Sequence, residues 1–120
     1  MYLPSKLNIY SFFALTIYLT SASVAHSEIL LKDYDRIKST PEFNHYLEGL
    51  GRGYTWANSR MQLNDSKPLF CPPSKLPITL SNYSQILEKE AADSNPIELH
   101  PDTPIELLLL DGLINTFPCN

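Results

Sequence analysis

The chain has 120 residues, 43% of them hydrophobic, with 10 prolines, 4 glycines and 2 cysteines. This profile is typical of one compact domain with proline-stiffened loops, and the length excludes a two-domain enzyme. The formal net charge of −4 argues against nucleic-acid binding, because that affinity comes mainly from lysines and arginines that neutralise phosphates. A basic protein is the natural complement.

Residues 1–25 have the pattern of a secretory signal peptide. Lys6 precedes an apolar run over residues 7–19, and Ser23 and Ala25 fit the positions before a cleavage site at His26. The apolar run is shorter than the roughly 20 residues that span a bilayer, although an uncleaved anchor is the alternative. Cleavage would leave residues 26–120 as an exported domain that does not span the membrane, with 13 acidic against 8 basic residues.

Cys71 and Cys119 are the only cysteines, and export would carry them into an oxidising compartment. An even count there indicates a disulfide, and closing a loop of about 49 residues would stabilise the fold by roughly 4 kcal/mol. Two free thiols or a metal pair are the alternatives, but the cysteines and three scattered histidines have no recognisable metal-ligand spacing. We therefore expect one disulfide and no metal or other cofactor.

Hydrophobic spacing predicts an all-α fold, a small bundle of about four helices. Residues 29–37 suggest a short first helix. A long amphipathic helix follows, with Thr40 as its cap and Pro41 in its first turn. Its apolar stripe consists of Phe43, Leu47, Leu50, Tyr54, Ala57 and Met61.

Three glycines lie inside this long helix, where each costs roughly 0.5 to 1 kcal/mol relative to alanine. Gly49 and Gly53 share one face, flanked by Tyr46 and Trp56. We expect another helix of the same chain to pack closely there, with a partner protein as the alternative.

Residues 68–77 contain four prolines, which preclude a helix and predict an extended strap. Cys71 would pin this strap and place Leu69 and Phe70 on the core. A third helix, capped by Thr79 or Ser81, is expected to turn Leu80, Tyr83, Leu87 and Ala91 inward and Glu88, Lys89 and Glu90 outward.

An exposed linker over residues 93–102 leads to the last helix. The segment Thr103-Pro104-Ile105-Glu106 has the pattern of a capping box with proline at the first helical position. The following residues are apolar around most of the circumference, which predicts a buried central helix. Asp111 on that helix would need a structural hydrogen-bond partner.

No pattern for catalysis is present in the chain. It has no Gly-x-Ser-x-Gly turn, no His-Glu-x-x-His helix and no phosphate-binding glycine loop. His45 and His100 are interpreted as surface residues. The sequence therefore predicts a binding protein rather than an enzyme.

Residues 43–119 resemble the Rap and Tai family of periplasmic immunity proteins of bacterial type VI secretion. The most specific elements are the Phe-Cys-x-Pro strap at 70–73 and the Phe-Pro-Cys ending at 117–119. The other matching positions are Tyr46, Gly49, Tyr54 to Trp56, Leu69, Tyr83, Ile86, Leu87, Leu109 and Leu113. Many relatives carry a further cysteine where this chain has Asn44 and His45, which implies a single disulfide between Cys71 and Cys119.

The resemblance implies an all-helical protein that waits in the periplasm and binds an incoming toxin, typically a cell-wall amidase. An acidic stretch offers a contact surface for a basic partner and consists of Glu88, Glu90, Asp93, Glu98 and Asp102. Two other functions are open: a periplasmic acid-stress chaperone with one disulfide, and an inhibitor of a host lysozyme. Self-association into a homodimer is also open.

Overall fold

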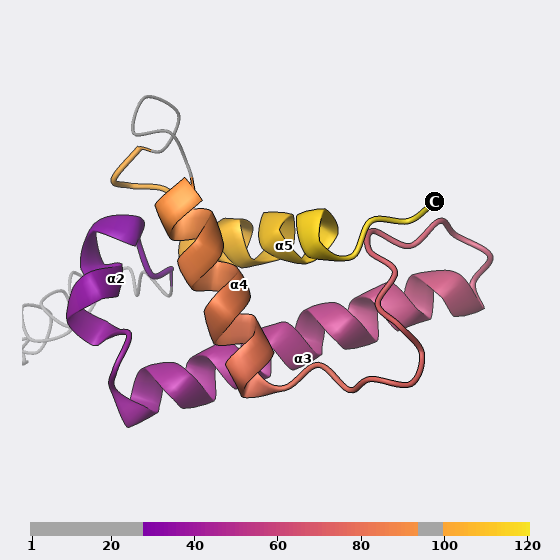
Figure 1. The fold of residues 1–120 in the computed structure, drawn as a ribbon, viewed down its shortest axis with the longest axis horizontal. Coiled ribbons are helices and arrows are strands. Elements are labelled where there is room, and N and C mark those ends of the chain that lie inside the picture. The colour runs from indigo at the N-terminus through magenta and orange to yellow at the C-terminus, as the bar shows by residue number, and fades with distance from the viewer. Residues whose placement is uncertain (1–27, 94–99) are drawn as a thin grey trace, which may run out of the picture.

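The computed structural model describes residues 28–93 and 100–120, and the predicted signal peptide and Glu98 lie outside these ranges. The described residues form four helices, which confirms the all-α fold (Figure 1). These are α2 (Leu31–Ile37), α3 (Pro41–Leu63), α4 (Leu80–Asp93) and α5 (Ile105–Thr116). None of them combines the length and the hydrophobicity that a membrane crossing requires.

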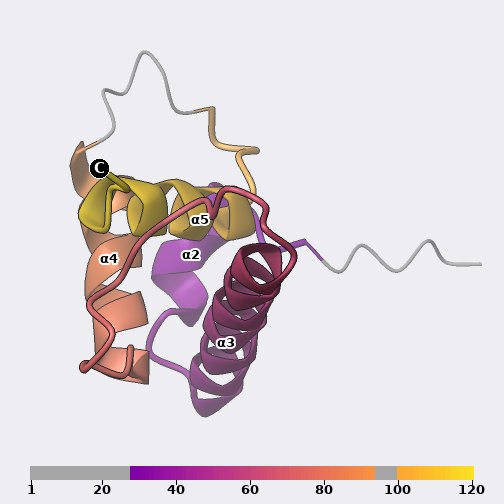
Figure 2. The same ribbon diagram turned by 90° about the vertical axis from the view of Figure 1, so that its right-hand side faces the viewer.

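Helix α3 forms one edge of the molecule. Its start is as predicted, since the Thr40 hydroxyl accepts a hydrogen bond from the Phe43 amide at 3.2 Å and Pro41 occupies the first turn. In Figure 2, which looks nearly along α3, the other three helices all lie to one side of it. The inward side of α3 contributes Phe43 and Leu47 to the core, while its opposite side has no described helix against it.

The core joins all four described helices and the strap, and Tyr34 is the contribution of α2. Its fully buried side chains are Leu47, Phe70, Tyr83, Leu87, Ile105, Leu109 and Leu113. Helix α5 contributes the last three of these, because residues 105, 109 and 113 are apolar and, at a spacing of four, lie on one face of the helix. The prediction of a central helix is confirmed for that inward side, but Leu107 and Asp111 are exposed, so Asp111 needs no buried partner and that prediction was wrong.

The strap over residues 68–77 contains no helix, but it is not extended throughout as predicted, because residues 74–76 form a turn in which the Leu76 amide donates to the Pro73 carbonyl at 3.2 Å. Two contacts fix the strap at Cys71. The disulfide between Cys71 and Cys119 is present, with 5.0 Å between the Cα atoms, and the Cys71 amide donates to the Phe117 carbonyl at 2.7 Å. Phe70 is fully buried as expected, but Leu69 is 47% exposed, so its predicted place on the core was wrong. Adjacent residues of an extended segment point to opposite sides, which leaves only one of the two facing inward.

The first described residues are tied to the start of α5. The Leu31 amide donates to the Thr103 carbonyl and the Ile105 amide to the Ile29 carbonyl, both at 2.9 Å. The predicted capping box is wrong here, because α5 begins at Ile105 and Pro104 provides no side-chain cap. The Glu106 carboxylate instead reaches the Ile29 amide at 3.1 Å and the Tyr46 hydroxyl.

Candidate functional site

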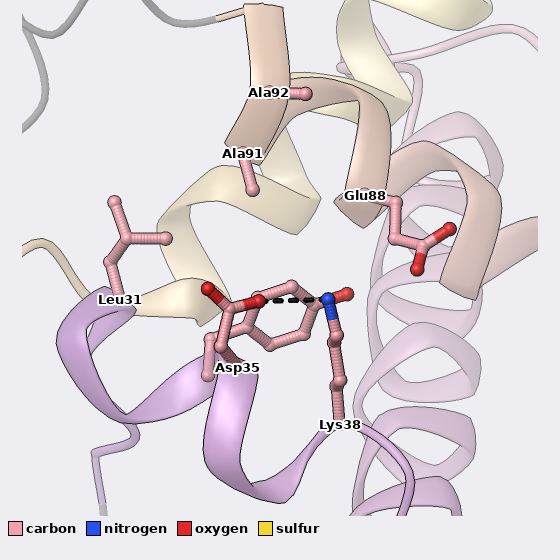
Figure 3. A pocket seen from close by; sticks show the side chains of 7 residues that line it. Leu31, Asp35, Lys38, Glu88, Ala91 and Ala92 are labelled. Atoms are coloured by element: carbon pink, nitrogen blue, oxygen red, sulfur yellow. Dashed lines mark hydrogen bonds and ion pairs between the residues drawn. The ribbon is translucent and has the colours of Figure 1, made fainter.

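A groove of about 570 Å³ lies between α2 and α4 (Figure 3). Its apolar lining comes from Leu31 and the ring of Tyr34 on α2 and from Ala91 and Ala92 on α4. Its charged lining consists of Asp35, Lys38 and Glu88. Helical spacing explains the set, since residues 31, 34, 35 and 38 share one face of α2, and 88, 91 and 92 share one face of α4.

Lys38 lies between the two acids of this groove. Its Nζ donates to Asp35 Oδ1 at 2.8 Å and lies 5.6 Å from the centroid of the Tyr34 ring. The hydrogen bond to Asp35 is the main cause that raises the pKa of Lys38, and Glu88 adds to it from across the groove. Two carboxylates against one ammonium leave the groove with a net negative charge.

The groove can bind a basic side chain. An arginine or lysine carries an apolar stem, which would lie against Leu31 and Ala91, and a cationic end, which would meet Asp35 and Glu88. The Tyr34 ring adds an aromatic face that attracts cations. Lys38 now occupies this position, and because it is joined to an exposed aspartate it can swing aside at little cost.

The predicted acidic stretch is divided by the fold. Glu88 lines the groove, whereas Glu90 faces α5, where Asn115 Nδ2 lies 3.4 Å from its Oε1. Two residues apart on a helix, these side chains point to nearly opposite sides. Glu88 is therefore the acid of the stretch that belongs to the groove.

Asp102 lies in the turn before α5 and is already paired. Lys32 Nζ donates to Asp102 Oδ1 at 2.5 Å, and His100 Nδ1 lies 3.6 Å from its other oxygen. The hydrogen bond from Lys32 lowers the pKa of Asp102 and raises that of Lys32. Asp93 is the last residue of α4, its side chain lies outside the described part, and so does Glu98.

The glycines of α3 do not pack as predicted. A Cβ built at Gly49 or Gly53 would meet nothing within 4 Å, so the expected internal packing there was wrong. The close approach is at Gly51, two residues along the helix and therefore on nearly the opposite side, where a Cβ would lie 2.5 Å from the Tyr83 ring. The face with Gly49, Gly53 and Trp56 is thus uncovered by the described chain, and Trp56 is 76% exposed.

The sequence analysis missed the roles of two polar residues that organise the fold, Asn58 and Glu106. Asn58 is buried on α3, where its Oδ1 accepts from the Leu69 and Phe70 amides and its Nδ2 donates to the Phe70 carbonyl. A polar residue on the buried side of the helix was the available signal. For Glu106 the sequence contains no such signal, because its partners Ile29 and Tyr46 lie 77 and 60 residues away along the chain.

The described residues contain no group of three or more histidines, cysteines or acids that could hold a metal ion, and both described histidines are exposed, as predicted. Both cysteines are joined in the disulfide and cannot act as nucleophiles. What the described surface does offer is the groove with its carboxylates and the bare face of α3.

No protein-family model, no curated protein and no solved structure matches this chain.

Proposed function

We propose that this chain is a periplasmic immunity protein, which binds a type VI secretion effector and so protects the producing cell from itself and its siblings. The resemblance of residues 43–119 to the Rap and Tai family names this class of function and, as the target, a peptidoglycan amidase. In this proposal residues 1–25 direct export and are removed. The disulfide between Cys71 and Cys119 fits an oxidising compartment such as the periplasm.

The observation that carries the proposal is the groove between α2 and α4. It places Glu88 and Asp35 beside an apolar floor, which is the arrangement that a basic loop of a partner protein needs. Both walls are helices fixed by a common core, since Tyr34 and Leu87 are buried in it. A preformed surface loses little entropy on binding, which an inhibitor that must act at once requires.

The function is tested by protection of a cell. The candidate toxin is the protein encoded by the gene next to the one for this chain. It is directed to the periplasm of a laboratory bacterium, with and without this chain, and growth is measured. We expect the full chain to restore growth, and a chain without residues 1–25 to fail because it stays on the wrong side of the membrane. Growth that the full chain does not restore would contradict the proposal, provided that the chain is detected in the periplasm.

The groove is tested by charge reversal at Glu88. We expect Glu88→Lys to weaken binding of the toxin roughly tenfold, mainly through slower association, because the basic partner then meets a cation. Surface plasmon resonance at two salt concentrations measures this. Glu88 is exposed, so the helical circular-dichroism signal should not change.

Asp111→Lys is the matched control for this experiment. It changes the net charge by the same amount at an exposed position on α5 outside the groove. Equal affinities of the two variants would remove the groove as the contact. A chain that binds no toxin, but on acidification binds a hydrophobic dye and suppresses aggregation of unrelated proteins, would instead be the stress chaperone.

A further inference from the structure

We propose that the end of α3 docks this protein on the surface of a lipid bilayer that contains anionic phospholipids. The docking surface, the α3 tip, is defined by Trp56, Arg60, Leu63 and Lys67. The inference concerns a contact with lipid headgroups and does not depend on the function proposed above.

Two exposed apolar side chains mark the α3 tip. Trp56 is 76% and Leu63 75% exposed, the two highest values among the large hydrophobic side chains of the described chain. They are seven residues apart, which is about two turns, so both lie on one side of the helix. Leu47, nine residues before Trp56, is fully buried on the opposite side. The two exposed side chains therefore project away from the core, where a partner could remove them from water.

Two cations accompany these apolar side chains. Arg60 is exposed and lies on the same side of α3. Lys67 is exposed in the loop after the helix, and a tight turn keeps it close. In that turn Asp65 has a φ of 56° and the Ser66 amide donates to the Met61 carbonyl at 2.9 Å. Lys67, the next residue, therefore starts beside the last turn of α3.

The two cations of the α3 tip have no ion-pair partner among the described residues. The cations of α2 are different, since Lys32, Arg36 and Lys38 each bind an aspartate. A cation without a partner meets a lipid phosphate without first breaking an ion pair. The positive charge of the tip is thus free to act on an anionic surface.

The charges of the whole chain would orient the protein on such a surface. Residues 52–80 carry four cations and one acid, whereas the other residues between 26 and 120 carry four cations and twelve acids. Figure 1 places the end of α3 at one end of the molecule and α2 at the other. An anionic surface attracts the first end and repels the second, so the groove between α2 and α4 stays on the side away from the bilayer.

The combination of groups is the reason to choose a bilayer as the occupant. Tryptophan is enriched at membrane interfaces, and leucine with neighbouring arginine or lysine is typical of segments that lie among the headgroups. The stems of the two cations can follow the hydrocarbon while their charged ends stay at the phosphates. In Figure 1 α3 extends beyond α4 and α5 at this end, so a flat surface can reach its tip.

Tryptophan fluorescence tests the contact. Trp56 is the only tryptophan, so its emission reports on the α3 tip alone. The protein is used as residues 26–120, which contain the whole described core and lack the apolar run over residues 7–19. It is titrated with phosphatidylglycerol vesicles up to millimolar lipid, because a contact of this size is expected to be no stronger than that of one myristoyl chain, roughly 10⁴ M⁻¹.

We expect the emission to shift to shorter wavelength and to be quenched by lipids that carry bromine on their acyl chains. Phosphatidylcholine vesicles should produce neither effect. Salt at 1 M should reverse the shift, because the Debye length falls to about 3 Å.

Neutralised charges identify the surface. We expect Arg60→Gln and Lys67→Gln each to lower the affinity for anionic vesicles about fivefold, the loss of one cation near an anionic surface, and the double variant R60Q/K67Q about 25-fold. Lys89→Gln is the matched control, at an exposed position on α4, and should change the affinity less than twofold.

The apolar part of the tip is tested by Leu63→Ser. We expect this variant to bind anionic vesicles at least threefold more weakly, because less apolar surface leaves water. Leu107→Ser, at an exposed position on α5, is its control and should bind as the original does. Circular dichroism checks that all variants are folded.

An emission that does not respond to anionic vesicles would overturn the inference, as would an equal response to phosphatidylcholine. Equal losses in the Arg60→Gln and Lys89→Gln variants would also overturn it, since the attraction would then not belong to the α3 tip. No toxin is present in these measurements, so such a failure would leave the immunity function to its own test.

Discussion

Two of the four glycines touch the core and two do not, although all four lie in helices. A Cβ at Gly112 would lie 2.5 Å from Ile86 Cγ2 and 2.7 Å from Glu90 Cγ, and one at Gly51 would meet the Tyr83 ring. These two glycines let α4 approach α5 and α3. At Gly49 and Gly53 a Cβ would meet no such neighbour within 4 Å, so these glycines lower the helix propensity of α3 without permitting a close contact in the described chain.

Alanine substitutions separate the two kinds of glycine. We expect Gly49→Ala and Gly53→Ala each to raise the free energy of unfolding by about 0.5 to 1 kcal/mol, because alanine restricts the unfolded chain and fits the space. Gly51→Ala should lower it by about 1 to 3 kcal/mol, since the methyl group displaces a buried tyrosine ring. Urea denaturation of dilute protein measures all three. Equal effects at Gly51 and Gly53 would contradict the packing described for α3.

Among the elements, the strap contains neither a helix nor a strand, and its first residues are held by side chains from other parts of the chain. Asn58 satisfies three backbone groups of Leu69 and Phe70 that would otherwise be buried without partners. The disulfide holds the next residue, Cys71, to the end of the chain. The Asn58 side chain therefore supplies hydrogen bonds that a neighbouring strand would supply in a sheet, and the disulfide fixes the position of the segment.

Loss of the Asn58 amide should loosen the strap. We expect Asn58→Ala to lower the free energy of unfolding by about 2 to 3 kcal/mol, because it removes three hydrogen bonds and leaves buried backbone groups unpaired. Chemical denaturation with the disulfide intact measures the change. Gln62→Ala, an exposed amide on the same helix, is the control and should change stability by less than about 0.5 kcal/mol. A similar loss in both variants would show that the strap does not rely on Asn58.

At the scale of the whole molecule, α5 joins both ends of the described chain. Its first turn binds the segment before α2 through Glu106, and the residues after it bind the strap through Cys119. Glu106 Oε1 accepts from the Tyr46 hydroxyl and Glu106 O from the Tyr54 hydroxyl, so α3 is joined at the same place. High pH should weaken these contacts, because the Tyr46 and Tyr54 hydroxyls are phenols and can no longer donate a hydrogen bond once they lose their protons.

Stability should fall above about pH 10. Burial raises the pKa of Tyr34, Tyr46 and Tyr54 above the ordinary value of 10.0, and for Tyr46 the hydrogen bond to Glu106 raises it further. The folded protein keeps these protons when the unfolded chain begins to release them. Their contribution to stability is therefore complete below about pH 10 and is lost progressively as the pH rises.

Urea denaturation between pH 8 and pH 11 measures this loss of stability. Tyr46→Phe removes the hydroxyl whose pKa is raised most. The free energy of unfolding of this variant should therefore depend less steeply on pH than that of the original protein, although at pH 8 it should be lower by about 1 kcal/mol. Identical slopes for the two proteins would contradict the role of the Tyr46 hydroxyl.

Much of the architecture was determined by local features of the sequence. Apolar spacing, the Thr40 cap with Pro41, and the proline run placed all four helices and the strap, because helix formation and termination depend on residues within a few turns of each other. The signal-peptide pattern of residues 1–25 together with the cysteine count predicted the disulfide, since two cysteines allow only one pairing.

The tertiary structure alone decided which neighbours meet. Helical periodicity identifies a face of α3 but not what covers it, so Gly51 rather than Gly49 and Gly53 meets Tyr83, and Trp56 is left bare. Glu106 reaches Tyr46 instead of its own helix end because a chain segment remote in sequence arrives beside it. The groove likewise combines Asp35 with Glu88, more than 50 residues apart, a pairing that no local pattern encodes.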